Sequence, residues 1–422
     1  MKRSNKIVFV NRYFYPDESA TSRLLSDLAF RLAGQGLSVS VVTSRQLYGN
    51  PNAALPSEEL TRGVHVHRVA TFNRGRAHLS GRALDYASFH VAASFALMRQ
   101  LTRGDVVVAK TDPPLLSTGV SQVALLKGAV LVNWLQDLFP EVAAVLTPNL
   151  LPNWLQHGLL AARDRSLRRA AVNVVLSTGM RQQLVERGID GSRIRIVPNW
   201  ADASSLTPRP VEQSTIRRSL GLTGRFVLGY SGNLGRAHEF DTLLGTATLL
   251  KADPQFAFLI TGAGAKADGL RRAVAAAGLT SFVFQDYQPP ELLADSLAAA
   301  DVHLVSLLPA LEGLIVPSKL YGILAAGRPA VFIGSLSGDV AKVIQDHGCG
   351  IAVGVGESEK LATALRLWRN DSGTVRQMSD NARRVALEHY TPNQAVASWL
   401  ALLMEIAPAM AGGVGFIPER TG

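Results

Sequence analysis

The sequence predicts an α/β protein of two doubly wound domains, in which helices cover both faces of a mainly parallel sheet. Short apolar runs rich in Val and Ile alternate with longer helical patterns along all 422 residues, and continuous apolar runs are typical of parallel strands buried on both faces. A polar stretch rich in Pro and Ser, between Pro198 and Gly224, interrupts the alternation near mid-chain. Each half is large enough for one domain of about 150 to 200 residues.

Strands are expected wherever a short Val/Ile run lies between turn signals. In the first domain these runs fall near residues 7–10, 38–43, 63–69, 105–109, 129–135, 173–177 and 194–197. In the second they fall near 226–231, 256–261, 282–285, 302–306, 330–333 and 350–354. Helical patterns between them complete repeated strand–helix–strand units, for example at 19–34, 239–250 and 267–277.

Domain boundaries follow from this pattern. We expect a first domain at 1–200, a linker at 201–223 and a second domain at 224–388. After a break at Pro392, the tail 389–410 contains an apolar helical pattern that is expected to cross back onto the first domain.

Composition excludes a disordered or coiled-coil protein, because 47% of the residues are hydrophobic and 18% are charged. The net charge of +10 is uneven, since residues 1–200 carry 24 Lys or Arg against 13 Asp or Glu, and residues 201–422 carry 19 against 20. The first domain, at +11, is therefore expected to meet an anionic partner. The single Cys349 and the lack of any run of about 18 apolar residues favour a cytoplasmic protein that is soluble or peripheral to a membrane.

In doubly wound sheets, ligands bind outside the carboxyl ends of the strands, so the loops after strands are the candidate binding sites. The first such loop of the second domain, "SGNLGRAH", contains Gly232, Asn233, Gly235, Arg236 and His238. Small residues and basic groups at a helix entrance can form a cradle for a diphosphate. The alternative is a tight turn in which the glycines only supply a positive φ.

Two further loops of the second domain can approach the same ligand. Gly262 and Gly264 permit close backbone approach after one strand, and Tyr287 lies in a loop that could face a base ring. In "LEGLIVPSKLYGILAAGRP", Glu312 could accept hydrogen bonds from sugar hydroxyls, while Ser318 and Lys319 suit a phosphate. The alternative for this last loop is a capped surface helix with a solvated lysine.

The first domain offers a second set of strand-end residues. Ser19 and Ala20 begin a helix after the first strand, where backbone N–H groups could reach a phosphate. Asp137 could position or deprotonate an acceptor hydroxyl, or it could simply cap the next helix. Residues of the same kind, all expected near an acceptor, are Arg12, Lys110, Asp112 and Glu141.

Several other chemistries find no support in the sequence. The nine histidines show no metal-ligand spacing, so no catalytic metal or other cofactor is expected. No G-x-G-x-x-G fingerprint, P-loop or G-x-S-x-G elbow is present, which disfavours a nicotinamide dehydrogenase, a P-loop enzyme or a serine hydrolase.

Specific strings along nearly the whole chain carry a resemblance to a known family. They are "YFYPDESATSRLLSDLAFRLAGQGLSVSVVTS", "TDPPLL", "NWLQDLFPEVA", "VPNW", "YSGNLGRAHEFDTLL", "ITGAG" and "LEGLIVPSKLYGILAAGRPAV". The sequence resembles family 4 glycosyltransferases of the GT-B fold, in which two Rossmann-like domains face a central cleft. "QDLFPE" and "VPSKLYGILAAGRP" resemble the bacterial subgroup that builds O-antigen, colanic acid and other surface polysaccharides.

The resemblance implies a retaining, metal-independent hexosyl- or N-acetylhexosaminyl-type transferase. The second domain would hold a nucleotide-diphosphate sugar, here a UDP-sugar, and the first would hold a saccharide or polyprenyl-diphosphate-linked acceptor. Asp137, Glu312 and Lys319 would be the catalytic residues. Asp137 lies near the place of a family histidine, and the family's Gly-Gly phosphate loop is replaced by Ser19-Ala20-Thr21.

The family's E-x7-E signature is incomplete in this chain. Glu312 matches its first glutamate, but the second falls at Leu320, or at Gly322 in another alignment, and neither is acidic. Two alternative functions therefore stay open, namely a nucleotide-sugar-binding subunit without catalysis and a UDP-sugar epimerase of the same fold. No set of acidic and histidine residues points to the epimerase.

The basic excess of the first domain concentrates around one apolar helical stretch. Residues 62–110 contain eight basic residues but only two acidic ones, Asp85 and Asp105. The apolar string "LDYASFHVAASFALM", with Tyr86, Phe89 and Phe95, lies within this range. This stretch is either a core helix or a helix lying on the anionic inner face of the plasma membrane. Nucleic acid is not expected as a partner, because aromatic residues do not interleave the basic ones.

Overall fold

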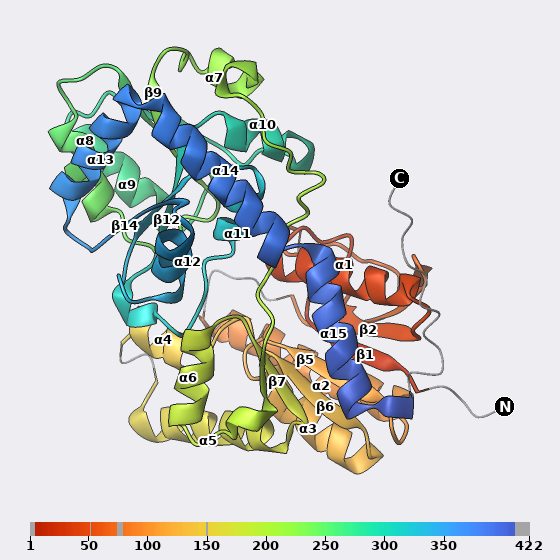
Figure 1. Cartoon of the computed structure of the whole chain (residues 1–422). Coiled ribbons are helices and arrows are strands. Elements are labelled where there is room, and N and C mark those ends of the chain that lie inside the picture. Colours follow the sequence, from red (N-terminus) through yellow and green to blue (C-terminus); the bar gives the residue numbers. More distant parts are fainter. Residues whose placement is uncertain (1–4, 51, 74–78, 149–150, 410–422) are drawn as a thin grey trace. The chain divides into compact units, whose positions relative to one another are not determined.

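The computed structural model describes residues 5–50, 52–73, 79–148 and 151–409, and divides the chain into two compact units (Figure 1). Unit 1 comprises Met1–Pro198 together with Pro392–Gly422, and unit 2 comprises Asn199–Thr391. Both units are layered α/β structures with helices on the two faces of a sheet. Within the described residues, no helix is both long and apolar enough to cross a membrane.

Unit 1 is built on a sheet with the strand order β3-β4-β2-β1-β5-β6-β7-β8. Its strands are β1 (Ile7–Val10), β2 (Val39–Ser44), β3 (Glu58–Thr61), β4 (Val64–Val69), β5 (Val106–Lys110), β6 (Val130–Trp134), β7 (Val172–Val175) and β8 (Ile194–Ile196). Only β3 runs antiparallel, against β4. β3 is not among the strands predicted from the sequence, because its residues alternate between exposed and half-buried positions and form no apolar run.

Seven helices of unit 1 cover this sheet within the described residues. They are α1 (Ala20–Gly34), α2 (Leu79–Gln100), α3 (Leu116–Lys127), α4 (Glu141–Leu146), α5 (Asn153–Arg169), α6 (Thr178–Glu186) and α15 (Pro392–Ile406). Val8 and Val10 share a core with α2 and α3. Because side chains alternate along a strand, Phe9 faces the opposite side of the sheet, where it meets α15.

The tail helix α15 is anchored in unit 1 by an aromatic cluster. The fully buried Trp399 lies with its ring centroid 6.2 Å from that of Phe9 and 5.0 Å from that of Trp134, both edge to face. Such pairs stabilise beyond the area they bury. This contact explains why Pro392–Gly422 belongs to the same unit as the first strands.

Unit 2 contains a parallel sheet with the strand order β11-β10-β9-β12-β13-β14. Its strands are β9 (Phe226–Ser231), β10 (Phe256–Thr261), β11 (Phe282–Gln285), β12 (Val302–Ser306), β13 (Ala330–Ile333) and β14 (Gly350–Val353). Its helices are α7 (Thr215–Ser219), α8 (Asp241–Leu249), α9 (Ala267–Ala276), α10 (Leu293–Ala298), α11 (Lys319–Ala325), α12 (Asp339–His347), α13 (Ser358–Asn370) and α14 (Ser372–His389).

The segment expected as a linker, 201–223, instead packs onto unit 2. Ile216 and Leu222 are buried there, next to strands of the sheet. The backbone N–H of Thr215 donates to Asp295 at 3.1 Å, and Arg217 pairs with Asp301 at 2.9 Å. A polar composition indicated a linker, but these side chains form specific bonds to residues some eighty positions later, which the local pattern does not reveal.

Each sheet reverses its strand order at one point, between β1 and β5 in unit 1 and between β9 and β12 in unit 2. Ligands of doubly wound sheets bind outside the carboxyl ends of the strands at this reversal. The loops after β9 and β12, and those after β1 and β5, are thus where the fold places candidate binding residues.

Candidate functional site

In unit 2, the loops after β9 and β10 touch each other through backbone atoms. Gly262 and Gly264 have φ angles of +133° and +151°, which L side chains rarely adopt. A Cβ atom at Gly262 would lie 2.1 Å from the carbonyl oxygen of Gly232, and one at Gly264 would lie 2.5 Å from Oδ1 of Asn233. Glycine is therefore required at both positions for the loops to meet.

The ammonium of Lys319, the first residue of α11, lies against this pair of loops. Its Nζ is 3.6 Å from the ring centroid of Tyr230, and the same Nζ would lie 3.7 Å from a Cβ atom placed on Gly232. Although the residue as a whole is partly exposed, Nζ itself is buried and has no hydrogen-bond partner among the described residues. Burial lowers the pKa of Lys319 well below its usual value.

A buried ammonium with only an aromatic ring beside it costs free energy, because the ring replaces little of its lost hydration. An anion in the adjoining space would compensate that cost. The backbone N–H groups of Gly232 and Leu234 already donate to the carbonyls of Thr261 and Ala263. The side chain of Lys319 is thus a buried cation left here to neutralise a bound anion, and the exposed Arg236 of the same loop is a second cation.

His238 lies in the same cluster but does not supply positive charge. Its Nδ1 is 2.6 Å from the carbonyl oxygen of Ser306, at the end of β12, so Nδ1 carries the hydrogen and Nε2 is left as an acceptor. Burial, together with the nearby charge of Lys319, lowers the pKa of His238 to about 4. This lowered pKa favours a neutral imidazole near pH 7, so a donor-binding role of His238 would use its ring nitrogens as hydrogen-bonding groups.

The remaining donor-side residues have more open surroundings. Arg236 and Ser318 are exposed, and the Ser318 hydroxyl does not cap α11. Gly235 is half-buried between Arg236 and Leu234. Tyr287 is 56% exposed, and its hydroxyl lies 3.4 Å from the carbonyl oxygen of Ala263, so its ring stands beside the glycine loop.

Glu312 is engaged with α12. The backbone N–H of Asp339, the first residue of α12, donates to Oε1 of Glu312 at 2.9 Å. Its other oxygen, Oε2, is buried and has no partner among the described residues, and burial raises the pKa of the carboxyl. Glu312 therefore caps a helix with one oxygen and keeps the other available for a ligand hydroxyl.

In unit 1, Asp137 follows β6 and borders a small cavity. Its Oδ1 is buried without a partner among the described residues, and the cavity, lined also by Lys110, Thr111 and Arg163, measures about 20 Å³. A space of this size holds one water molecule. Burial, reinforced by the charge of Asp112, raises the pKa of Asp137 to about 6.

Arg12 and Lys110 both have partners within unit 1. Arg12 is buried, 3.8 Å from Asp85, with its guanidinium 5.2 Å from the ring centroid of Tyr86. Lys110 donates to the carbonyl oxygen of Thr21 at 2.6 Å, and burial lowers its pKa to about 7 although Asp112 acts in the opposite direction. These contacts tie β1, β5, α1 and α2 together and favour a structural role for both cations.

Asp112 connects these two regions of unit 1. Its carbonyl oxygen accepts a 2.7 Å hydrogen bond from the backbone N–H of Arg12, and its half-buried carboxylate acts on the pKa values of both Lys110 and Asp137. The loops after β1, β5 and β6 thus meet around Asp112.

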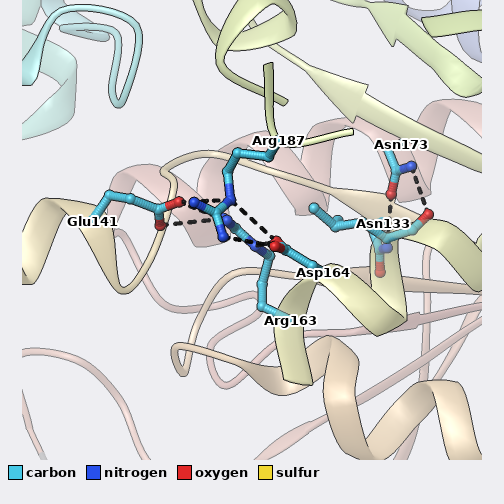
Figure 2. A network of polar contacts seen from close by, with 7 residues as sticks. Asn133, Glu141, Arg163, Asp164, Asn173 and Arg187 are labelled. Carbon is cyan, nitrogen blue, oxygen red and sulfur yellow. Dashed lines mark hydrogen bonds and ion pairs between the residues drawn. The ribbon is translucent and has the colours of Figure 1, made fainter. Parts of the chain in front are cut away.

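Glu141 belongs to an ion-pair network rather than to an open loop (Figure 2). Figure 2 shows the guanidinium groups of Arg163 and Arg187 between the carboxylates of Glu141 and Asp164. Arg163 is 2.6 Å from Glu141 and 2.8 Å from Asp164, and Arg187 is 2.7 Å from Asp164. Burial opposes ionisation, but the two arginines lower the pKa of Asp164 below its usual value. The network joins α4, α5 and the end of α6, so it holds the segment after Asp137 in place.

Ser19 and Ala20 open α1 next to an aspartate that the sequence analysis overlooked. The Ser19 hydroxyl and backbone N–H both donate to Oδ1 of Asp17, at 2.5 and 2.9 Å. The backbone N–H of Tyr48 donates to the other oxygen of Asp17. Asp17 thus fixes the loop, and Ala20 is exposed at the start of the helix.

Two residues of the unit 2 cluster were also missed. Tyr230 lies under Lys319 and donates its hydroxyl to the carbonyl oxygen of Asn233 at 2.7 Å. Lys266 donates to the carbonyl oxygen of His238 at 2.6 Å and so ties two loops together. Tyr230 stands within the string "YSGNLGRAHEFDTLL" and Lys266 two residues after "ITGAG", but neither string indicates which side chains face the loops.

Family models match both halves of the chain. Residues 20–200 match a "Glycosyl transferase 4-like domain", and residues 212–385 match "Glycosyl transferases group 1". The chain belongs to the family 4 glycosyltransferases. The two matched segments correspond closely to unit 1 and unit 2, so the two clusters described above lie in the two domains of a glycosyltransferase.

Curated relatives and solved structures agree with this family. The chain is 28% identical to the probable glycosyltransferase WbjE of Pseudomonas aeruginosa over 66% of this chain and 69% of that protein. It is 24% identical to the putative colanic acid biosynthesis glycosyl transferase WcaI of Escherichia coli K12, over 86% of this chain and 91% of that protein. The Anabaena protein HepE, solved in complex with UDP, is similar in fold, with a TM-score of 0.70 at 15% identity over 95% of this chain and all of that one. The fold is GT-B, with two Rossmann-like domains.

Proposed function

We propose that the protein is a retaining, metal-independent transferase of hexosyl or N-acetylhexosaminyl groups in the biosynthesis of a bacterial surface polysaccharide. Its donor is a UDP-sugar, and its acceptor is a saccharide carried on a polyprenyl diphosphate at the inner face of the plasma membrane, where the protein is peripheral. The observation that carries the proposal is the buried ammonium of Lys319, which has no anion beside it in unit 2.

The donor assignment rests on the chemistry of the unit 2 cluster. The glycine loops meet beside Lys319, and this buried lysine supplies one positive charge without competing water. A diphosphate is the anionic part of a nucleotide sugar, and Tyr287 offers an exposed ring beside the loop for stacking. That HepE was solved with UDP supports this choice of nucleotide.

The proposed chemistry needs no protein nucleophile. The bond between the anomeric carbon and the diphosphate oxygen breaks, the acceptor oxygen bonds to that carbon on the same face, and the acceptor proton passes to the leaving phosphate. Lys319 stabilises the negative charge that grows on the leaving group, which is the role of a fixed charge in a dry site. Asp137, with its buried and unpartnered oxygen, orients the acceptor hydroxyl.

The acceptor assignment follows from the relatives and from charge. WcaI is described as a colanic acid biosynthesis enzyme, and the names of WbjE and WcaI both identify glycosyltransferases. Sugar acceptors in the assembly of such polymers are carried on lipid diphosphates, and residues 1–200 have a net charge of +11 that suits an anionic lipid.

A transfer assay tests the proposal. Purified protein is mixed with a panel of nucleotide sugars, with and without a bacterial lipid extract, and release of the nucleoside diphosphate is measured together with sugar incorporated into lipid. We expect one UDP-sugar to turn over in a lipid-dependent manner. Binding of UDP without turnover on any acceptor would support a nucleotide-sugar-binding subunit instead, and conversion of the UDP-sugar to its epimer would support an epimerase.

Two lysine variants make the assay specific to the site. Lys319→Ala is expected to lose turnover, whereas Lys360→Ala, on α13 and paired with Glu357, serves as the matched control and should keep it. If Lys319→Ala turned over as fast as Lys360→Ala and wild type, Lys319 would not belong to the diphosphate site.

A further inference from the structure

Helix α2 presents an apolar stripe on the side that faces away from the core of unit 1. Phe89, Ala93 and Leu97 are fully buried against the sheet. On the other side of the helix, at spacings of three, four, four and three residues, lie Ala87 and a set of large apolar side chains that are 38% to 72% exposed: Leu84, Val91, Phe95 and Met98. Single exposed apolar residues are common, but a continuous stripe marks an interaction surface.

The charges on this side of α2 are all positive within the described residues. Arg99 is exposed at the edge of the stripe, whereas Asp85, the one acidic residue of α2, is buried and faces Arg12 in the interior. The guanidinium of Arg99 lies 4.2 Å from the ring centroid of Phe95, so a cation and an apolar group stand side by side. The outer face of α2 is therefore apolar and basic, with no exposed carboxylate on the helix.

The neighbouring helix α3 extends this surface. A Cβ at Gly119 on α3 would lie 3.2 Å from the Ser94 hydroxyl on α2, and beyond the two helices the N–H of Gly104 donates to the carbonyl oxygen of Gly128. The helices therefore run side by side in the same direction. At the end of α3, Leu125 and Leu126 are 64% and 73% exposed, with Lys127 next to them.

We propose that the outer face of α2, continued by the end of α3, is the surface by which unit 1 docks on an anionic lipid bilayer. The proposal rests on the proposed function in that a lipid-linked acceptor requires the enzyme to work at a membrane. A helix of this kind lies in the plane of the interface, with its apolar stripe among the acyl chains and its arginines at the lipid phosphates. The 22 residues of α2 do not form a membrane span, which agrees with this orientation.

The sequence left open whether this helix belongs to the core or lies on a membrane, and the structure assigns its aromatic residues to different environments. Phe89 belongs to the core, Tyr86 stacks on Arg12, and of the three aromatic residues singled out in the sequence only Phe95 is exposed. Arg74 and Arg76 lie outside the described residues, and the proposal does not use them. A second copy of this chain is a poorer occupant, because a symmetric contact would bring together two first domains whose residues 1–200 each carry a net charge of +11.

Binding to lipid vesicles tests the proposal. Full-length protein is sedimented with vesicles of phosphatidylglycerol and phosphatidylethanolamine, and with vesicles of phosphatidylcholine alone. We expect binding to the anionic vesicles only, and weaker binding as salt is raised. Phe95→Glu places a carboxylate in the stripe and should weaken the vesicle partition by about tenfold or more, whereas Leu367→Glu, at a 64% exposed leucine of α13 in unit 2, should leave it unchanged.

The outcomes distinguish a membrane-docking surface from a contact between two copies of the chain. Equal vesicle binding by wild type and Phe95→Glu, with unchanged melting temperatures, would overturn the proposal. So would a dimeric wild type that Phe95→Glu converts to a monomer without changing vesicle binding, since the stripe would then be a contact between copies. Transfer to a water-soluble acceptor analogue should be the same in Phe95→Glu and wild type, and its absence from both would count against the proposed function rather than against this surface.

Discussion

The buried cations of the two units differ in whether they have a partner. In unit 1, Arg12, Lys110 and Arg163 all find partners inside the same unit, at 3.8 Å for Asp85, 2.6 Å for the Thr21 carbonyl and 2.6 Å for Glu141. In unit 2, Nζ of Lys319 is buried without a partner among the described residues. Two carboxylate oxygens also lack one, Oε2 of Glu312 in unit 2 and Oδ1 of Asp137 in unit 1.

This difference distinguishes buried cations that stabilise the fold from a buried cation that is available to bind a ligand. A buried charge is tolerated when it is paired and hydrogen-bonded, and an unpaired one is costly. Evolution can retain such a cost at a site where function requires it. The comparison therefore assigns a scaffold role to the unit 1 cations and a ligand-binding role to Lys319.

The largest expected effect is on catalysis in unit 2. Lys319→Ala removes the cation proposed to stabilise the leaving diphosphate, and loss of one such group typically costs about 10²- to 10³-fold in kcat. Steady-state release of UDP from the donor, with acceptor at saturation, measures this loss. A variant with wild-type kcat would show that the unpaired charge has no catalytic part.

The next effect concerns the stability of unit 1. Arg163→Ala leaves Glu141 without its closest cation and Asp164, which is buried, with Arg187 alone. Breaking a buried ion pair from one side costs about 3–5 kcal/mol of the free energy of unfolding, which denaturant unfolding measures. UDP affinity should stay at the wild-type value, because the network belongs to the other unit, and a loss of UDP affinity without a loss of stability would contradict the division.

Asp137 provides a pH-dependent test within unit 1. Its pKa is raised from 3.8 to about 6 in the folded state, chiefly by burial, so the folded protein binds this proton more tightly than the unfolded chain. Its contribution to stability is therefore fully present below pH 3.8 and is lost as the pH rises through about 6. Asp137→Asn cannot ionise, and its free energy of unfolding should lack this decline when urea unfolding is followed between pH 4 and 8. Parallel pH profiles for the two proteins would show that Asp137 ionises normally.

The smallest effect is expected at the surface of unit 1. Arg195 and Glu405 form a 2.6 Å pair between β8 and α15, but their side chains are 37% and 55% exposed. Such pairs contribute about 0.2–1 kcal/mol, so Arg195→Ala should change the free energy of unfolding by no more than that. A larger loss would mean that the tail helix depends on this pair more than on the buried Trp399.

Most of the fold could be predicted from the sequence because parallel strands are uniform in composition. Runs such as "IVFV" and "FAFLIT" are apolar on both faces, and the structure has strands at Ile7–Val10 and Phe256–Thr261. β3 escaped because an antiparallel edge strand buries only part of one face and reads "EELT". The packing of segment 201–223 on unit 2 leaves no local signal, because its bonds to Asp295 and Asp301 join positions far apart in the chain.

The candidate site divides in the same way. Gly232, Gly262 and Lys319 could be predicted as candidates from local signals. Glycines after a strand indicate backbone with positive φ, and Lys319 follows a turn at a helix start. Whether a charge is already paired has no local signal. Glu141 looked like a residue that could face an acceptor, but Arg163 and Arg187, 22 and 46 positions away, occupy its carboxylate.

Thermal and denaturant unfolding of Lys319→Met, with and without UDP, tests the central claim most directly. Met fills a similar volume without a buried charge, so the unliganded variant should be more stable than wild type by about 1 kcal/mol, and UDP should no longer stabilise it appreciably. Wild type should be stabilised by UDP as ligand linkage requires. A variant that is less stable without UDP, or that UDP stabilises as much as wild type, would contradict the account of Lys319 as a charge kept unpaired for the donor diphosphate.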